Sequence, residues 1–373
     1  MEFTRQKRAI LPHSRLPMLY AFGSNGNGQL SLGDKEDTHI PTRCEVPDDF
    51  PSTQPKQIVA GGNHTLVLFE CGRLFATGSN RNGECGIPVA VGTAFTCFQE
   101  VPPPPGRREE EDEDPRWALV SAGWDFSILV SAAGTIYSCG RVNNTNSSAA
   151  ATPSAPALQR ISPFSKSPIV CIASGMAHTL TVHESGEVYG WGAGRKGQLG
   201  EPAEKAVPEP RIVTLSFPAA AVACGREYSF VVSGDGSRHA LLGGNRRFTI
   251  LSDAPPQGGL LGWKKIGGAW GSVAVLFSDG TIKAWGRNDR GQLPPDGLRG
   301  VQDLAVGSEH GVAVAGGKLI AWGWGEHGNC GKEGGRDVVG EVFEVAVVGD
   351  GIVKAVGAGC ATSWVWRVGD WIP

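Results

Sequence analysis

The amino-acid sequence predicts an all-β fold, a seven-bladed β-propeller whose ring is closed by one blade shared between the N- and C-termini. Two observations predict it: a unit of apolar runs separated by glycine-rich turns recurs along the chain, and two half-units stand at its ends. Strand-sized runs with a period of about 40–50 residues are typical of propeller blades or solenoid repeats. The composition agrees, because 54 of the 373 residues are glycine, about twice the usual share of roughly 7%.

Four copies of the repeat are complete. In each, an apolar run, a glycine, a second run, a glycine turn, a third run and a glycine-rich polar loop follow one another. Short apolar runs bounded by turns such as Ser-Asp-Gly indicate antiparallel hairpins. The complete copies are Ile58–Gly86, Ile169–Gly200, Trp263–Leu293 and Val301–Gly331.

Two weaker copies and two half-copies complete the set. Leu119–Asn144 lacks the closing loop, and Ala220–Phe248 keeps the glycine and the strands. Ile352–Trp366 carries only the first half of the repeat, and Met18–Gly33 carries only the second half. Joined, the half-copies make a seventh blade. A closed ring is favoured over an open solenoid, because closure pairs edge strands that would otherwise template aggregation.

Segments outside the repeat set the predicted domain organisation. Residues 18–373 are predicted to form a single propeller domain, and residues 1–17 a disordered basic extension. Flexible insertions are expected at about 88–117 and 143–168. The first insertion contains the acidic run Glu109–Asp114 and the second is rich in Asn, Ser, Ala and Pro, compositions that favour solvated chain.

Charge and cysteine usage limit the partners and the compartment. The net charge of −3 gives no electrostatic case for direct nucleic-acid binding. Nine cysteines are scattered with no C-x-x-C spacing, which favours reduced thiols and a cytoplasmic and nuclear location. No apolar stretch approaches the roughly 18–20 residues that span a membrane, so no membrane association is expected.

The sequence offers no catalytic motif, and we predict neither an enzyme nor an intrinsic metal or cofactor. Gly192–Gly197 and Gly323–Gly328 match G-x-G-x-x-G, but no helical pattern follows, as a dinucleotide site requires. His64, His178 and His310 share one repeat position. They are expected to hydrogen-bond backbone at the start of each blade's inner strand, too far apart in a ring to share one ion.

Candidate binding residues are those at which a blade departs from the repeat. Large aromatic side chains beside charged groups are typical of binding hot spots. Trp191, Trp285 and Trp322 share one repeat position and are instead expected in the core. The remaining tryptophans of the candidate set fit the core as well as a surface. The candidate partner-binding residues are Trp124, Asp125, Trp270, Glu309, His310, Trp324, Glu326, His327 and Trp364.

The repeat G-x-x-H followed by W-G-x-x-x-x-G-Q-L resembles that of the regulator-of-chromosome-condensation family, whose fold is a seven-bladed propeller. The resemblance covers Met18 to about Trp366. Two more specific segments, WGWGEHGNCG at Trp322–Gly331 and GCATSW at Gly359–Trp364, resemble the fungal killer-toxin-insensitivity propellers, also called alpha-tubulin suppressors. The residues before Met18 and the insertions near the second copy depart from that branch.

This resemblance implies a non-catalytic scaffold that forms a heterodimer with a small zinc-ribbon protein. The partner would carry Cys-ligated zinc or iron and serve two pathways. One is diphthamide synthesis on elongation factor two, through an iron–sulfur radical enzyme, and the other is modification of tRNA wobble uridines by the Elongator complex. The candidate residues would contribute to the partner-binding face.

Two alternative functions come from the same superfamily. One is guanine-nucleotide exchange on a small GTPase with chromatin association, which the net charge disfavours. The other is ultraviolet-B reception as in a related plant propeller, which uses Gly-Trp-Arg-His-Thr in consecutive blades. This chain has Gly-Trp-Asp-Phe-Ser once, at Gly123–Ser127, with no arginine beside the tryptophan.

Overall fold

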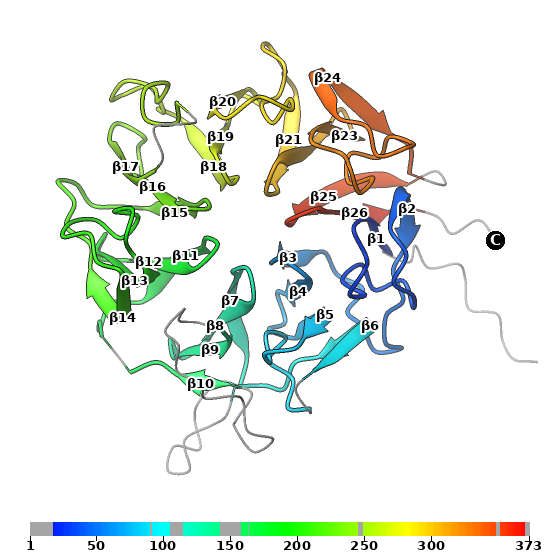
Figure 1. The fold of residues 1–373 in the computed structure, drawn as a ribbon, viewed down its shortest axis with the longest axis horizontal. Helices are drawn as coiled ribbons and strands as arrows, with labels where there is room; N and C mark the ends of the chain where they lie inside the picture. Colours follow the sequence, from blue (N-terminus) through cyan, green and yellow to red (C-terminus); the bar gives the residue numbers. More distant parts are fainter. Residues whose placement is uncertain are drawn as a thin grey trace, which may run out of the picture.

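The computed structural model describes residues 18–89, 92–104, 115–141, 158–162, 164–244, 249–347 and 351–369. Within them every regular element is a β-strand. The strands form seven antiparallel sheets, which stand in a ring around a central axis (Figure 1). The predicted all-β, seven-bladed propeller is confirmed.

We number the blades I to VII, beginning with the closing blade. Each is described from its innermost strand outward. Blade I holds β25 (Ile352–Ala358), β26 (Thr362–Val368), β1 (Met18–Gly23) and β2 (Thr38–Arg43). Blade II holds β3 (Pro55–Ala60), β4 (His64–Phe69), β5 (Leu74–Asn80) and β6 (Thr93–Glu100). Blade III holds β7 (Trp117–Ala122), β8 (Phe126–Ser131), β9 (Ile136–Gly140) and β10 (Gln159–Arg160).

The remaining blades follow the same order. Blade IV holds β11 (Ile169–Ser174), β12 (His178–His183), β13 (Val188–Ala193) and β14 (Ala206–Ile212). Blade V holds β15 (Ala221–Cys224), β16 (Tyr228–Val232) and β17 (His239–Gly243). Blade VI holds β18 (Trp263–Gly268), β19 (Ser272–Phe277) and β20 (Ile282–Gly286). Blade VII holds β21 (Val301–Val306), β22 (His310–Ala315), β23 (Lys318–Gly323) and β24 (Val338–Val345).

The ring is closed by pairing between the two ends of the described chain. Strand β1 runs antiparallel to β26, with Met18 opposite Arg367 and Gly23 opposite Thr362. Figure 1 shows β1 and β2 beside β25 and β26, which complete the circle. The prediction of a composite blade built from both termini is therefore confirmed, and no inner strand of the ring is left without a neighbour.

The expected insertions are shorter than predicted. Strand β6 lies within 88–117 and pairs with β5, while β10 lies within 143–168 and pairs with β9. These segments supply the outer strands of blades II and III, which we predicted as solvated chain because acidic, Pro-rich and Ser/Ala-rich stretches surround them. The acidic run Glu109–Asp114, the predicted extension 1–17 and residues 142–157 lie outside the described residues.

The hydrophobic core lies between neighbouring blades. Phe230 of blade V and Trp285 of blade VI meet edge to face, with ring centroids 5.3 Å apart. The tryptophans that share one repeat position are buried as predicted, with exposed fractions of 1%, 4% and 1% for Trp191, Trp285 and Trp322. Because each blade packs on two neighbours, the central strands are buried on both sides.

Candidate functional site

One face of the ring, which we call the upper face, carries the candidate residues. The innermost strands end on this face, and the loops after β5 and its counterparts also emerge there. The opposite, lower face carries the short turns between the second and third strands, such as the turn between β8 and β9. The two faces therefore carry different sets of loops.

The G-x-x-H spacing that recurs within the repeat has a structural cause on the upper face. The Nε2 atoms of His64, His178 and His310 lie 2.8, 3.0 and 2.9 Å from serine hydroxyls of the next blade. The serines are Ser127, Ser229 and Ser363. We predicted backbone partners for these imidazoles, and the structure corrects this to a serine side chain.

Each serine hydroxyl donates its own hydrogen bond to the preceding blade. Ser127 Oγ donates to the carbonyl of Glu84 at 2.7 Å, and Ser229 and Ser363 make the same contact with the corresponding loops. The serine hydrogen is thus used, so the imidazole donates from Nε2. Burial lowers the pKa of His64, His178 and His310 to about 4, which keeps these rings neutral and joins neighbouring blades.

The repeat glycine makes room for the imidazole. A Cβ at Gly61 would overlap the ring of His64 and the backbone carbonyl of Gly123 in the next blade. Gly175 and Gly307 stand in the same relation to His178 and His310. Only glycine leaves space for this close approach, which explains the G-x-x-H spacing without invoking a ligand.

A small cavity of about 150 Å³ lies where the inner strands end around the central axis. Every blade contributes a glycine to its lining: Gly359, Gly61, Gly123, Gly175, Gly225, Gly268 and Gly307 for blades I to VII. Backbone hydrogen bonds connect the linings of neighbouring blades, such as Gly62 N to Trp124 O at 2.9 Å and Trp270 N to Ser308 O at 2.8 Å. This end of the axis is a rigid collar of main chain.

Two of the predicted tryptophans meet over this collar. Trp124 of blade III and Trp270 of blade VI stack with ring centroids 5.7 Å apart and an interplanar angle of 41°. The guanidinium of Arg226, in blade V, lies 5.3 Å from the ring of Trp270. Blades III and VI are not neighbours, so the indoles reach across the axis. Both side chains remain partly exposed, which gives an aromatic cluster with one cation at the centre of the upper face.

A second group lies at the seam between blades VII and I. Trp324 and His327 meet edge to face at 5.6 Å. His327 Nδ1 lies 2.8 Å from Asp37 Oδ2, in the first loop of the chain, and both side chains are partly exposed. Glu326 is exposed beside them. This seam therefore presents an indole, an imidazole and two carboxylates to solvent.

The other predicted charges are engaged within the fold. Glu309 forms an ion pair with Arg287 of blade VI, and only 8% of Glu309 is exposed. Asp125 lies 3.7 Å from Arg141. Burial raises the pKa of Asp125, and the nearby Arg141 opposes that rise.

Three predicted site residues do not belong to an open surface. Trp364 is 0% exposed and packs in the core between blades I and II, and His310 is 1% exposed in its serine contact. Glu309 is engaged in its ion pair with Arg287. Burial removes Trp364 and His310 from direct contact with any partner. The upper face retains Trp124, Asp125, Trp270, Trp324, Glu326 and His327.

Three residues near these sites, Glu84, Arg226 and Asp37, were not predicted from the sequence. Glu84 takes the place of the glutamine of the Gly-Gln-Leu loop, and burial raises its pKa. Because Glu84 departs from the repeat, the sequence alone could have singled it out. Arg226 and Asp37 had no such signal, because their contacts with Trp270 and His327 join different blades.

The described part of the chain contains no group of three or more His, Cys, Asp or Glu side chains able to hold a metal ion. Its nine cysteines are all separate thiols. In the same part, no helix has the length and apolar character needed to cross a membrane.

Comparison with known proteins settles the family. A model of the RCC1-like domain matches residues 18–365. The chain belongs to the RCC1-like domain family. This RCC1-like propeller is 31% identical to an RCC1 repeat-containing protein of Schizosaccharomyces pombe, C10F6.04, over 93% of this chain and 98% of the relative. It is 28% identical to the secretion-regulating guanine nucleotide exchange factor of Bos taurus, over 86% of this chain and 77% of the relative.

Solved structures share the architecture of this RCC1-like propeller. Prp20p of Saccharomyces cerevisiae superposes with a TM-score of 0.79 at 20% identity, covering 96% of this chain and 93% of Prp20p. Human WBSCR16 gives a TM-score of 0.76 at 18% identity, covering 93% of this chain and 99% of that one. At these identities the similarity concerns the fold alone.

Proposed function

We propose that this RCC1-like propeller is a non-catalytic scaffold that binds a small zinc-ribbon protein through its upper face. In this proposal the partner carries the Cys-ligated zinc or iron. The heterodimer supports diphthamide synthesis on elongation factor two and Elongator-dependent modification of wobble uridines in tRNA. The partner assignment rests on WGWGEHGNCG and GCATSW, which resemble the killer-toxin-insensitivity branch of the family.

The observation that carries the binding role is the Trp124–Trp270 pair beside Arg226. Tryptophan and arginine are enriched among residues that dominate binding energy, and such residues cluster near the centre of an interface. Here they stand at the centre of one face, partly exposed, with their main chains fixed by the collar. A preformed aromatic cluster loses little conformational freedom on binding, which favours affinity.

Surrounding charges favour a partner of mixed polarity. Glu326, His327 and Asp37 form a polar seam to one side of the tryptophans, and Arg226 supplies a cation on the cluster itself. Charges at the rim of an interface mainly set orientation and association rate. The propeller would use them to orient the small partner, and its bulk would shield the partner's metal.

Co-expression with the small zinc-ribbon diphthamide protein of the same host tests the proposal. Size-exclusion chromatography with mass detection should give a one-to-one complex. Replacing Trp124 and Trp270 with alanine should weaken binding at least ~10-fold, since such centres contribute about 2 kcal/mol or more. The matched control replaces Leu261 and Ile352, exposed by 62% and 55% at the starts of inner strands on the lower face, and should bind normally.

Thermal unfolding of each variant separates loss of binding from loss of fold. Two separate peaks at micromolar concentration would contradict the partner assignment. An unchanged affinity of the folded double tryptophan variant would instead contradict the proposed binding surface, but not the partner assignment.

A second candidate function has its own support. Two relatives, at 28% and 27% identity, are called secretion-regulating guanine nucleotide exchange factors, so exchange on a small GTPase is the alternative. Accelerated release of labelled GDP from purified small GTPases would favour it. Wild-type release rates over a panel of such GTPases would count against it.

A further inference from the structure

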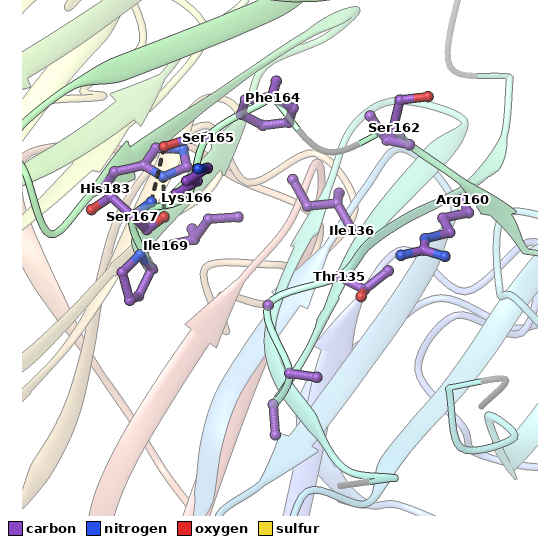
Figure 2. Close-up of a pocket in the computed structure, with 15 residues that line it drawn as sticks. Thr135, Ile136, Arg160, Ser162, Phe164, Ser165, Lys166, Ser167, Ile169 and His183 are labelled. Atoms are coloured by element: carbon purple, nitrogen blue, oxygen red, sulfur yellow. Dashed lines mark hydrogen bonds between the residues drawn. The ribbon is translucent and has the colours of Figure 1, made fainter. Parts of the chain in front are cut away.

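The lower face carries a cavity that the proposed partner site does not use. It has a volume of about 460 Å³ and lies between blades III and IV. Its walls are the turn between β8 and β9, the residues that follow β10, and the start of β11 (Figure 2). Cavities of about 300–1,000 Å³ are the usual size for small-molecule sites.

The blade IV wall of this cavity is fixed rather than loose. His183 Nδ1 donates to the carbonyl of Ser167 at 2.7 Å, and the backbone N of Ser185 donates to Ser167 Oγ at 2.9 Å. Phe164 packs on Tyr189, with ring centroids 4.9 Å apart. The chain after β10 is thereby held on blade IV. His183 is 2% exposed and uses both ring nitrogens, since Nε2 contacts Thr181 Oγ1 at 3.2 Å.

The blade III wall is fixed in a similar way. The backbone N of Ile161 donates to the carbonyl of Ile136 at 2.9 Å, and that of Ala132 donates to Arg116 O at 2.8 Å. Ser138 Oγ reaches the carbonyl of Gln159 at 3.3 Å. Both walls are therefore preformed, so a ligand would meet a site that needs little reorganisation.

The lining combines an apolar body with positive charge. Ile136, Ile161, Phe164 and Ile169 supply the apolar part. Arg160 and Lys166 are the charged residues of the lining that the structure describes, and that described lining contains no carboxylate. Figure 2 shows Arg160 on the side of Thr135 and Lys166 on the side of His183. Neither cation takes part in an ion pair within the described residues.

We infer that this cavity binds an organic anion, with its carboxylate or phosphate head on Arg160 or on Lys166, the exposed cations at the two sides of the cavity, and its apolar body on the isoleucines and Phe164. Arginine matches planar and tetrahedral oxyanions through its fork of donors, and lysine adds a point charge. Thr135, Ser162 and Ser165 also line the cavity and supply hydroxyl donors. The site lies on the face opposite the tryptophan cluster, so it stands independently of the proposed partner.

Isothermal titration with two matched probes tests this inference. 2-Naphthoate has an anionic head and 2-naphthamide is its neutral counterpart; naphthyl phosphate then compares the two kinds of head. The background is the full chain with Glu109–Asp114 replaced by serine, so that the negative charge of this run does not enter the comparison of the two probes. We expect saturable one-site binding of naphthoate, at least ~10-fold tighter than that of naphthamide.

Charge-matched variants decide whether the cavity causes the preference for the anionic probe. The pair Arg160→Ala and Lys166→Ala should abolish the preference for the anion. The control pair Arg195→Ala and Lys196→Ala removes the same charge from exposed positions in the upper loop after β13 and should keep it. Equal affinity for both probes, absence of naphthoate binding, or an equal loss in the control pair would overturn the inference.

Discussion

His64 of blade II donates a hydrogen bond from Nε2 to Ser127 Oγ of blade III, over 2.8 Å and with both side chains buried. The same arrangement recurs between blades IV and V and between blades VII and I. In blade III the position of the histidine is taken by Phe126, which packs on Gly123. The ring is therefore held in part by three neutral imidazoles that must stay unprotonated.

We predict that acid destabilises the propeller through these histidines. Burial lowers their pKa from 6.5, the value for an exposed imidazole, to about 4 in the folded state. Because the folded pKa is the lower one, the contribution of each neutral imidazole to the free energy of unfolding is complete above about pH 6.5 and is lost as pH falls toward 4. The loss of stability is up to about 3 kcal/mol for each histidine. His64→Phe should reduce the fall in urea midpoint between pH 7.5 and 5.

The control for this prediction is Ser127→Ala, because it removes the same hydrogen bond but keeps the buried imidazole of His64. It should keep the acid response. At pH 7.5 His64→Phe should cost only about 1 kcal/mol for the lost hydrogen bond. An unchanged acid response in His64→Phe would contradict the assignment of acid sensitivity to the imidazole.

We predict that Glu84→Gln raises stability at neutral pH. Ser79 Oγ and Asn82 N both donate to the Glu84 carboxylate, at 2.6 and 2.7 Å. In blade I, Gln29 already makes the equivalent contacts with Asn27 N and Ser24 Oγ. The amide can therefore replace the carboxylate without a buried charge, with a gain on the order of 1 kcal/mol.

The pH dependence provides the check on Glu84. Burial raises the folded pKa of Glu84, so the native carboxyl favours the folded state when protonated, and this benefit is lost as pH rises through the folded pKa. The melting temperature of Glu84→Gln should exceed that of the wild type at pH 7.5, with the gap closing in acid. A lower melting temperature at pH 7.5 would show that the charge is needed.

We predict that Gly61→Ala strongly destabilises the protein. An added Cβ would overlap the backbone carbonyl of Gly123, the ring of His64 and the collar around the axis. Overpacking of this kind costs about 1–3 kcal/mol, and more where backbone must shift. Gly26→Ala is the matched control, because its Cβ meets no atom within 4 Å. Denaturant midpoints of both variants, measured at one pH, provide the comparison.

The closed ring could be predicted from the sequence because equivalent residues recur at the same position of each repeat. Trp191, Trp285 and Trp322 could be placed in the core from their shared position, and the composite blade followed from two complementary half-repeats. The outer strands β6 and β10 could not be placed: β10 has only two residues, both exposed, and β6 lies in a segment whose prolines and acidic run favoured solvated chain. Periodicity reports burial, and the outer strand of a blade has a weak pattern.

The candidate site was harder to predict because the second strand of a blade is covered on both sides. Trp364 stands on β26, whose residues from Thr362 to Arg367 are all buried. Alternation along such a strand does not separate core from surface. Contacts between blades, such as Asp37 with His327 and Arg226 with Trp270, join segments far apart in sequence, and a repeat pattern contains no signal for them.

The composite blade sets a constraint on the order of folding. Strand β1 begins at Met18, yet its partner β26 ends at Val368. During synthesis β1 leaves the ribosome before β26, and until the residues between them have been made it can pair only with β2. Contacts of such large sequence separation slow folding and prolong the exposure of unpaired strand edges. The interval between the first and last strands is therefore the period in which this chain most needs protection by a chaperone.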